Sequence, residues 1–253
     1  MITVVCCKTN QAIYNAGLGK GLKIQNVKFE YIEPPTDKRL TVAYNSILPR
    51  LKTDVVAFLH QDLLLLEPSW LRRAEKYCKT VPKLGVAGVA GISWDGIPTG
   101  WIIDKVGSSK KPRKKYYGKL YGTYKKMFGS PFKEPKLVQT IDSMAVIMPT
   151  DVFKRVQFDK NLICLLATDI CLSVKYKLNL DTYVLPLATW HCPIGFNKQK
   201  TKKDGKSLVP VGSSKAYIPF NLREVLVKGE RKKIKEKWQG KFKSVRATVG
   251  KLI

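Results

Sequence analysis

Two histidines and one carboxylate are the residues of this chain best suited to chemistry. His60 ends an apolar run and opens the tripeptide His60-Gln61-Asp62, and His191 ends a second apolar run far along the chain. If residues 55–60 form a strand, the side chains of residues 60 and 62 point to the same side. An imidazole and a carboxylate there, joined by a second imidazole, could hold a divalent metal or a charged phosphate ester.

Two other interpretations stay open at this point. Both histidines could be hydrogen-bonded structural residues. His191 could also bind zinc together with Cys192, although the spacing is not that of a typical zinc site. The chain has six cysteines but no CxxC pair, so we expect reduced, buried fillers of a cytosolic protein.

The segments that must position these residues alternate between strands and helices. Strands are predicted within 2–7, 24–32, 55–60, 84–92, 137–148 and 179–187. Helices are predicted within 37–51 and 67–79, with further helix starts near 150 and 168. This alternation predicts an α/β fold with a mainly parallel sheet and right-handed crossovers. Ligands bind such sheets at the carboxyl ends of the strands.

Composition limits the class of protein. With 253 residues, 44% of them apolar, the chain can bury the core of one sizeable domain and is not a disordered polycation. Its net charge of +27 indicates an anionic partner: a phosphorylated ligand, a nucleic acid or an acidic membrane surface. No apolar run is long enough to span a membrane, and the N-terminus lacks a signal peptide's features. We therefore expect a cytoplasmic protein.

Much of the positive charge lies in two segments. Residues 108–136 carry ten Lys or Arg among four tyrosines, which predicts a mobile loop or short helical insertion over a site. The tail from Lys228 onward spaces apolar residues three to four apart, which predicts an amphipathic basic helix. That helix either packs on its own domain or contacts an anionic membrane peripherally, on its inner face.

The order of the motifs resembles that of the family-2-like glycosyltransferases, in a branch that has His-X-Asp where others have Asp-X-Asp. The resemblance covers roughly residues 1–196. The motifs are, in order, Tyr44-Asn45, Phe58-Leu59-His60-Gln61-Asp62, Pro68-Ser69-Trp70-Leu71, Gly85-Val86-Ala87-Gly88, Thr140-Ile141-Asp142, Phe158-Asp159, Ala167-Thr168-Asp169-Ile170-Cys171-Leu172 and Trp190-His191.

This resemblance implies a GT-A fold, a Rossmann-like α/β sandwich with a mainly parallel central sheet. It also implies a nucleotide-sugar donor, a glycan or lipid-linked acceptor, and a divalent metal, Mn²⁺ or Mg²⁺. The domain would span residues 1–196 with the insertion 108–136, and residues 197–253 would form a basic, partly helical extension.

The resemblance also implies roles for single residues. Asp62 would hold the metal on the donor diphosphate, His60 would contact the nucleotide or a metal-bound water, and His191 would approach the same metal. Thr9, Glu33 and Asn45 would form the nucleoside pocket.

Two aspartates compete for the part of catalytic base. Asp169 would lie near the acid that deprotonates the acceptor, and Asp142 near the wall between donor sugar and acceptor. The family often carries Glu-Asp just before this stretch, where this chain has Leu165-Leu166-Ala167. Asp169 could therefore be structural, with Asp142 or Asp159 as the base.

Other classes remain as alternatives. A nucleic-acid-binding protein would use the two basic segments on a phosphate backbone, but no nucleic-acid-binding signature is present. A metal-dependent nucleotidyltransferase would share the nucleotide site but would need a second acidic metal pair. The sequence therefore favours a metal-dependent inverting glycosyltransferase.

Overall fold

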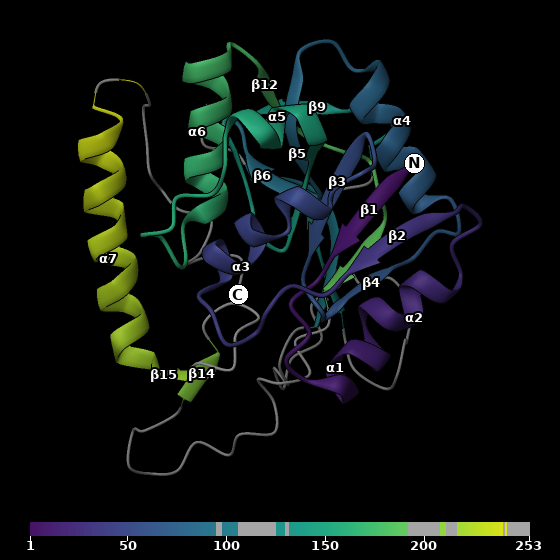
Figure 1. The fold of residues 1–253 in the computed structure, drawn as a ribbon, viewed down its shortest axis with the longest axis horizontal. Coiled ribbons are helices and arrows are strands. Elements are labelled where there is room, and N and C mark those ends of the chain that lie inside the picture. The colour runs from purple at the N-terminus through teal and green to yellow at the C-terminus, as the bar shows by residue number, and fades with distance from the viewer. Residues whose placement is uncertain are drawn as a thin grey trace.

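The computed structural model describes residues 1–94, 98–105, 125–129, 132–191, 208–210, 217–239 and 241. They form a layered α/β structure with a central sheet, helices on both of its faces and a smaller second sheet (Figure 1).

The central sheet has seven strands in the order β2-β1-β3-β11-β5-β12-β9. Their bounds are β1 Ile2–Val5, β2 Phe29–Ile32, β3 Val55–Leu59, β5 Leu84–Gly88, β9 Lys136–Val138, β11 Ala145–Pro149 and β12 Asp181–Val184. The pairings orient β2, β1, β3, β5 and β12 alike, whereas β11 and β9 run in the opposite direction. The predicted mainly parallel sheet is thus confirmed.

Alternation along the strands builds a core on each face of the sheet. In β3, Val55, Ala57 and Leu59 pack into one core, and Val56 and Phe58 into the other, as the period of two requires. Helices α3, α5 and α6 cover one face, and α2 and α4 cover the other (Figure 1). The bounds are α1 Gln11–Ala16, α2 Leu18–Lys23, α3 Leu40–Ser46, η1 Leu48–Arg50, α4 Trp70–Thr80, α5 Thr150–Arg155 and α6 Leu166–Leu178.

The second sheet has the order β10-β6-β7-β13-β4, with β8 paired to β7. Its strands are β4 Leu63–Leu65, β6 Ala90–Ile92, β7 Pro98–Lys105, β8 Lys125–Gly129, β10 Thr140–Ile141 and β13 Thr189–His191. Two further short strands, β14 Leu208–Pro210 and β15 Tyr217–Pro219, pair with each other.

Two strand predictions need correction. The segment 84–92 is two strands, β5 in the central sheet and β6 in the second. The segment 137–148 likewise divides into β9, β10 and β11, and Asp142 lies in the turn between the last two. The segment 84–92 is rich in glycine, and close packing is one reason. A Cβ on Gly88 would lie 2.9 Å from the carbonyl oxygen of Ala145.

The basic segments are described only in part. The insertion 108–136 was predicted as a loop or short helix, but residues 125–129 form β8; most of the rest lies outside the described residues. The predicted domain boundary at 196/197 also lies outside them.

Helix α7, Phe220–Lys237, begins before the tail and extends into it, and it lies beside α6 (Figure 1). Its residues Ile234 and Trp238 are buried with Leu162, Leu165 and Leu172. These two apolar residues therefore pack on the chain's own domain, and the prediction for residues 242–253 lies outside the described residues. No helix within the described residues is long and apolar enough to cross a membrane.

Candidate functional site

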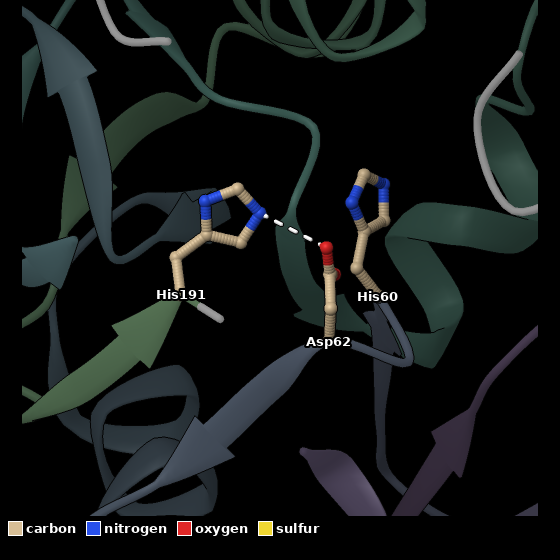
Figure 2. A group of neighbouring side chains, drawn as sticks. All are labelled: His60, Asp62 and His191. Carbon is tan, nitrogen blue, oxygen red and sulfur yellow. Dashed lines mark ion pairs between the residues drawn. The ribbon is translucent and has the colours of Figure 1, made fainter. Parts of the chain in front are cut away.

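The side chains of His60, Asp62 and His191 converge on one point. Their potential ligand atoms all lie within 4.8 Å of one another, and His191 Nε2 lies 3.3 Å from Asp62 Oδ2. Figure 2 shows the two imidazoles on either side of the carboxylate, on chain segments from opposite halves of the sequence. Within the part of the chain that the structure describes, no other group of three or more His, Cys, Asp or Glu residues lies close enough together to share a metal.

The end of β3 positions His60 and Asp62. Leu59 pairs with Ala145 of β11, and the His60 N–H donates to the carbonyl of Met144 at 2.9 Å. The chain then turns through Gln61 and Asp62 into β4. Both ligand candidates therefore leave a fully buried strand at its carboxyl end, where ligands meet α/β sheets.

His191 is positioned by the second sheet. It is the last residue of β13, pairing with Leu63 of β4 on one side and with Asp104 of β7 on the other. Because Leu63 directly follows Asp62, this register brings His191 beside the carboxylate.

A partly buried polar network holds the segment that leads to β13. The indole N–H of Trp70 donates to the Thr189 hydroxyl at 3.0 Å, and the Ala188 N–H donates to the Glu67 carboxylate. Arg73 donates to the Pro186 carbonyl at 2.7 Å and also pairs with Glu67. Helix α4 therefore fixes this segment to the edge of the site.

The electrostatics suit a cation. Burial lowers the pKa of His60 below its ordinary value, and His191 acts in the same direction, whereas the carboxylates of Asp62 and Asp142 oppose it. Burial acts to raise the pKa of Asp62, but the two neighbouring imidazoles outweigh it and the net pKa is lowered. At neutral pH the site therefore offers an ionised carboxylate and a neutral His60 imidazole, the forms that bind metals.

The donor set fits a divalent metal. Two imidazoles and one carboxylate are common ligands of first-row transition metals. His60 Nε2 is buried and has no hydrogen-bond partner among the described residues. This ring nitrogen is therefore free to bind a metal. Asp62 and His191 are each about one-sixth exposed, which keeps the group reachable from solvent.

Gln61, between the two ligand candidates, is a residue that sequence reasoning missed. Its Oε1 accepts hydrogen bonds of 3.0 Å from the backbone N–H groups of Thr9 and Asn10, and its Nε2 donates to the Thr9 hydroxyl at 2.9 Å. The Leu18 N–H donates to the Gln61 carbonyl. Gln61 thus ties the loop after β1 to the turn that carries His60 and Asp62. No local pattern predicted this role, because Gln61 lies in the turn between β3 and β4 and its partners lie about fifty residues away.

The structure separates the two candidate bases. Asp142 is partly exposed, lies near enough to His60 to influence its pKa, and its Oδ1 accepts from the Met144 N–H at 2.9 Å. Asp169 is 0% exposed. Its carboxylate accepts from the indole of Trp238 and the ammonium of Lys237. Asp169 is thus buried and paired by α7 and the residue after it, whereas Asp142 stays partly exposed on the side of His60.

The three residues predicted to contact the nucleoside do not all lie at the same place. Thr9 lies beside the turn formed by residues 60–62, to which Gln61 connects it. Glu33 lies just after β2 and pairs with Lys8 at 2.6 Å. Both follow strands parallel to β3 and therefore lie at the same sheet edge. Asn45 is different: its amide donates to the Phe158 carbonyl at 2.8 Å and accepts from the Phe158 N–H at 3.1 Å. Its side chain links α3 to the backbone of Phe158, and its contact with a nucleoside stays a prediction. Cys192, the partner in the zinc alternative, lies outside the described residues.

Comparison with known proteins gives a distant likeness of fold. No protein-family model matches the sequence, and no curated protein matches it. Among solved structures, the mannosyltransferase PcManGT from Pyrobaculum calidifontis, in complex with GDP-Man and Mn²⁺, matches with 8% identity and a TM-score of 0.49 over 76% of this chain and 56% of that chain. TarS of S. aureus in complex with UDP-GlcNAc matches with 14% identity and a TM-score of 0.45 over 75% and 57%. A197 from STIV matches with 10% identity and a TM-score of 0.38 over 75% and 84%.

The chain thus spans a little over half the length of the first two solved chains. Identities and TM-scores this low carry no inference about function, so the function proposed below rests on the site's own residues.

Proposed function

We propose that this chain is a metal-dependent inverting glycosyltransferase. It would move a sugar from a nucleotide-sugar donor to a hydroxyl group of a glycan or lipid-linked acceptor. The observation that carries this proposal is the convergence of His60, Asp62 and His191 at the carboxyl edge of a mainly parallel sheet. The motif order described above supports the same class.

Asp62 and His191 would hold a divalent cation, with His60 beside them. When bound, such a cation neutralises the negative charge that develops on a departing nucleoside diphosphate. The residues themselves supply preorganisation, because β3 and β13 fix the three side chains before any ligand arrives. Thr9 and Glu33, at the ends of β1 and β2, would face the nucleoside.

Asp142 would act as the base that takes the proton from the acceptor hydroxyl. Its Oδ1 is oriented by the Met144 N–H, and its partial exposure leaves it open to a substrate. A carboxylate base in this position contributes roughly 10²–10⁴-fold to the rate. One base suffices for direct attack on the face opposite the leaving group, which inverts the anomeric centre.

The test is nucleotide binding measured with and without metal. UDP, GDP, ADP and CDP, each with and without Mn²⁺, are screened by thermal shift, and GDP-Man and UDP-GlcNAc serve as first donors in a hydrolysis assay. A ligand present at 100 times its Kd should stabilise the fold by about 2.7 kcal/mol. We expect one nucleotide to stabilise the chain, and only when the metal is present.

Asp62→Asn provides the matched variant. It should lose metal-dependent nucleotide binding and donor turnover while it stays folded. Asp151→Asn, which changes an exposed carboxylate in the first turn of α5, should behave like the unmodified chain. Full turnover in Asp62→Asn would remove the metal assignment. Salt-sensitive binding of duplex or single-stranded nucleic acid, without any response to nucleotides, would favour the nucleic-acid-binding alternative.

A further inference from the structure

Helix α7 has two unlike sides, and one of them is fully occupied by its own domain. The positions that recur every three or four residues and are at most 8% exposed are Val227, Glu230, Ile234 and Trp238. Residues with this spacing lie along one side of a helix. That side packs on α6 and on the segment that leads into it. A membrane could reach these apolar residues only if α7 left the domain.

The opposite side of α7 carries mostly lysine. The charged residues that are exposed there are Lys228, Lys232, Lys233, Lys235, Lys237 and Glu236. Because Lys228, Lys232 and Lys235 are spaced by four and three residues, they form one stripe on the surface of the helix. Lys232 pairs with Glu236 at 3.9 Å, but their side chains are 81% and 58% exposed, and such a pair contributes little. The stripe therefore keeps a surplus of positive charge.

The stripe is short and held in place. Lys228 and Lys235 lie about 10 Å apart along the helix axis, close to the distance over which salt screens charges at physiological ionic strength. Their charges therefore act together on a nearby anionic surface. Figure 1 shows α7 at the outer edge of the molecule, beside α6. Glu230, which accepts from three backbone N–H groups before α6, keeps the stripe turned away from the domain.

The residue types favour a membrane surface over a nucleic acid. Lysine is a hydrated point charge on a flexible stem, whereas arginine offers the planar fork that recognises single phosphates. The arginine at position 231 is only partly exposed. Single-stranded nucleic acids also bind through exposed aromatic rings, but between residues 228 and 239 the aromatic residue is Trp238, which is 4% exposed. A stripe of lysines alone suits a diffuse anionic surface.

We propose that α7, while it stays docked on its own domain, binds an anionic phospholipid membrane through Lys228, Lys232 and Lys235. The contact is electrostatic and peripheral, and the apolar residues of the helix do not enter the bilayer. The two roles that the sequence presented as alternatives are then compatible, because they use opposite sides of one helix. This inference goes beyond the function proposed above and does not depend on it.

The experiment sediments the full-length chain, without donor or metal, together with lipid vesicles. One set of vesicles contains phosphatidylcholine alone, and the other also contains about 30% phosphatidylglycerol, which makes the surface anionic. We expect the chain to sediment with the anionic vesicles and to stay in solution with the neutral ones. Binding should weaken as salt is added, because salt screens the attraction between the exposed charges.

A matched pair of triple variants locates the contact. Lys228→Gln, Lys232→Gln and Lys235→Gln combined should weaken binding to the anionic vesicles on the order of 100-fold, because each lysine near such a surface contributes about fivefold. The control combines Lys→Gln changes at three exposed lysines on or beside α2 and α4, on the other side of the central sheet: Lys23, Lys28 and Lys76. It removes the same charge and should bind nearly as well as the unmodified chain. The other basic segments are common to both variants, so the difference between them reports on α7.

Four outcomes would overturn the proposal. Equal binding to neutral vesicles would mean that apolar insertion, not charge, drives the contact. Equal losses in the two triple variants would mean that overall charge acts without a preferred face. Faster hydrogen exchange at the amides of residues 163–165 on vesicles would mean that α7 leaves the domain. If a short DNA duplex binds more tightly than anionic vesicles at equal phosphate concentration, and loses that binding in the α7 variant, the stripe belongs to a nucleic acid instead.

Discussion

The carboxylate of Asp169 accepts a hydrogen bond of 2.8 Å from the indole N–H of Trp238. Asp169, which lies in α6 and was a candidate base, is thus covered by Trp238, the residue that follows α7. Lys237 pairs with the same carboxylate at 3.0 Å. Together these contacts indicate that Asp169 stabilises the docked helix.

Asp142 and Asp169 should therefore respond differently to removal of charge. Asp142→Asn should lower turnover by roughly 10²–10⁴-fold, as expected for loss of a general base, and should leave metal affinity and folding stability almost unchanged. Asp169→Asn should lower the free energy of unfolding by about 1–3 kcal/mol because a buried, paired carboxylate is lost, and should keep its turnover per folded molecule. Steady-state kinetics and urea unfolding of both variants check this; the reverse pattern would restore Asp169 as the base.

Gln61 should hold the loop after β1 against the turn formed by residues 60–62. Gln61→Ala removes the partner of two backbone N–H groups and one hydroxyl, and should cost about 1–3 kcal/mol of stability together with nucleotide affinity. Gln61→Glu keeps oxygen acceptors for the Thr9 and Asn10 N–H groups and should recover most of the stability. Gln11→Ala, at an exposed position of α1, is the control. Equal nucleotide affinity in Gln61→Ala and the unmodified chain would contradict the coupling.

Glu230 should anchor α7. This residue is 4% exposed, and its carboxylate accepts hydrogen bonds of 2.6–2.9 Å from the N–H groups of Ile163, Cys164 and Leu165, just before α6. Glu230→Gln can satisfy these donors with only one oxygen and should lose about 1–3 kcal/mol. Glu236→Gln, exposed on the same helix, should change stability by no more than about 0.5 kcal/mol. Unfolding curves decide; equal effects would mean that α7 is not held through this carboxylate.

The docking of α7 should weaken in acid. Burial acts to raise the pKa of Asp159, but the hydrogen bond from Lys237 and the other partners lower it overall. A carboxylate with a lowered folded-state pKa stabilises the fold above its unfolded pKa, and this contribution is lost as pH falls through the folded value. Burial acts to lower the pKa of Lys237, but its two aspartate partners raise it overall, so its contribution is present at neutral pH and is lost only in strong alkali.

We expect the stability of the unmodified chain to fall more steeply below about pH 4 than that of Asp159→Asn. Thermal unfolding across the acid range measures the difference. Parallel curves for the two proteins would show that this ion pair contributes nothing to the docking of α7.

The sequence predicted the parts of the fold that repeat a strong local pattern. The apolar runs at 2–7 and 55–60 contain β1 and β3, and the helix predicted within 67–79 is α4. Strands of two or three residues, such as β4, β10 and β13, leave too short a pattern to detect. The longer strands β7 and β8 of the second sheet were missed as well. His191 was expected to follow the strand now seen as β12, but it ends β13 instead.

Helix α2 was missed because Gly19 and Gly21 interrupt its helical pattern, and α1 was missed because Gly17 ends it after only six residues. The structure gives a reason for two of these glycines. A Cβ on Gly17 would lie 2.6 Å from the Gln61 carbonyl oxygen, and one on Gly21 would lie 2.6 Å from the Leu65 nitrogen. The glycines let α2 approach the turn of the site and β4 closely, a long-range requirement that no local pattern records.

The convergence of His60, Asp62 and His191 was predicted because strand ends and ligand chemistry coincide. The roles of Asn45 and Asp169 could not be judged in the same way. Phe158 and Trp238, the residues that engage them, lie far away in the sequence, so only the folded chain shows that these polar groups are already satisfied.

The two imidazoles of the candidate site belong to different sheets, one following β3 and the other ending β13. An ion shared between them would therefore act as a cross-link that closes a long loop of the chain and removes freedom from its unfolded ensemble. When the ion is bound, the amide protons of both β3 and β13 should therefore exchange with solvent more slowly, because the two sheets would open together.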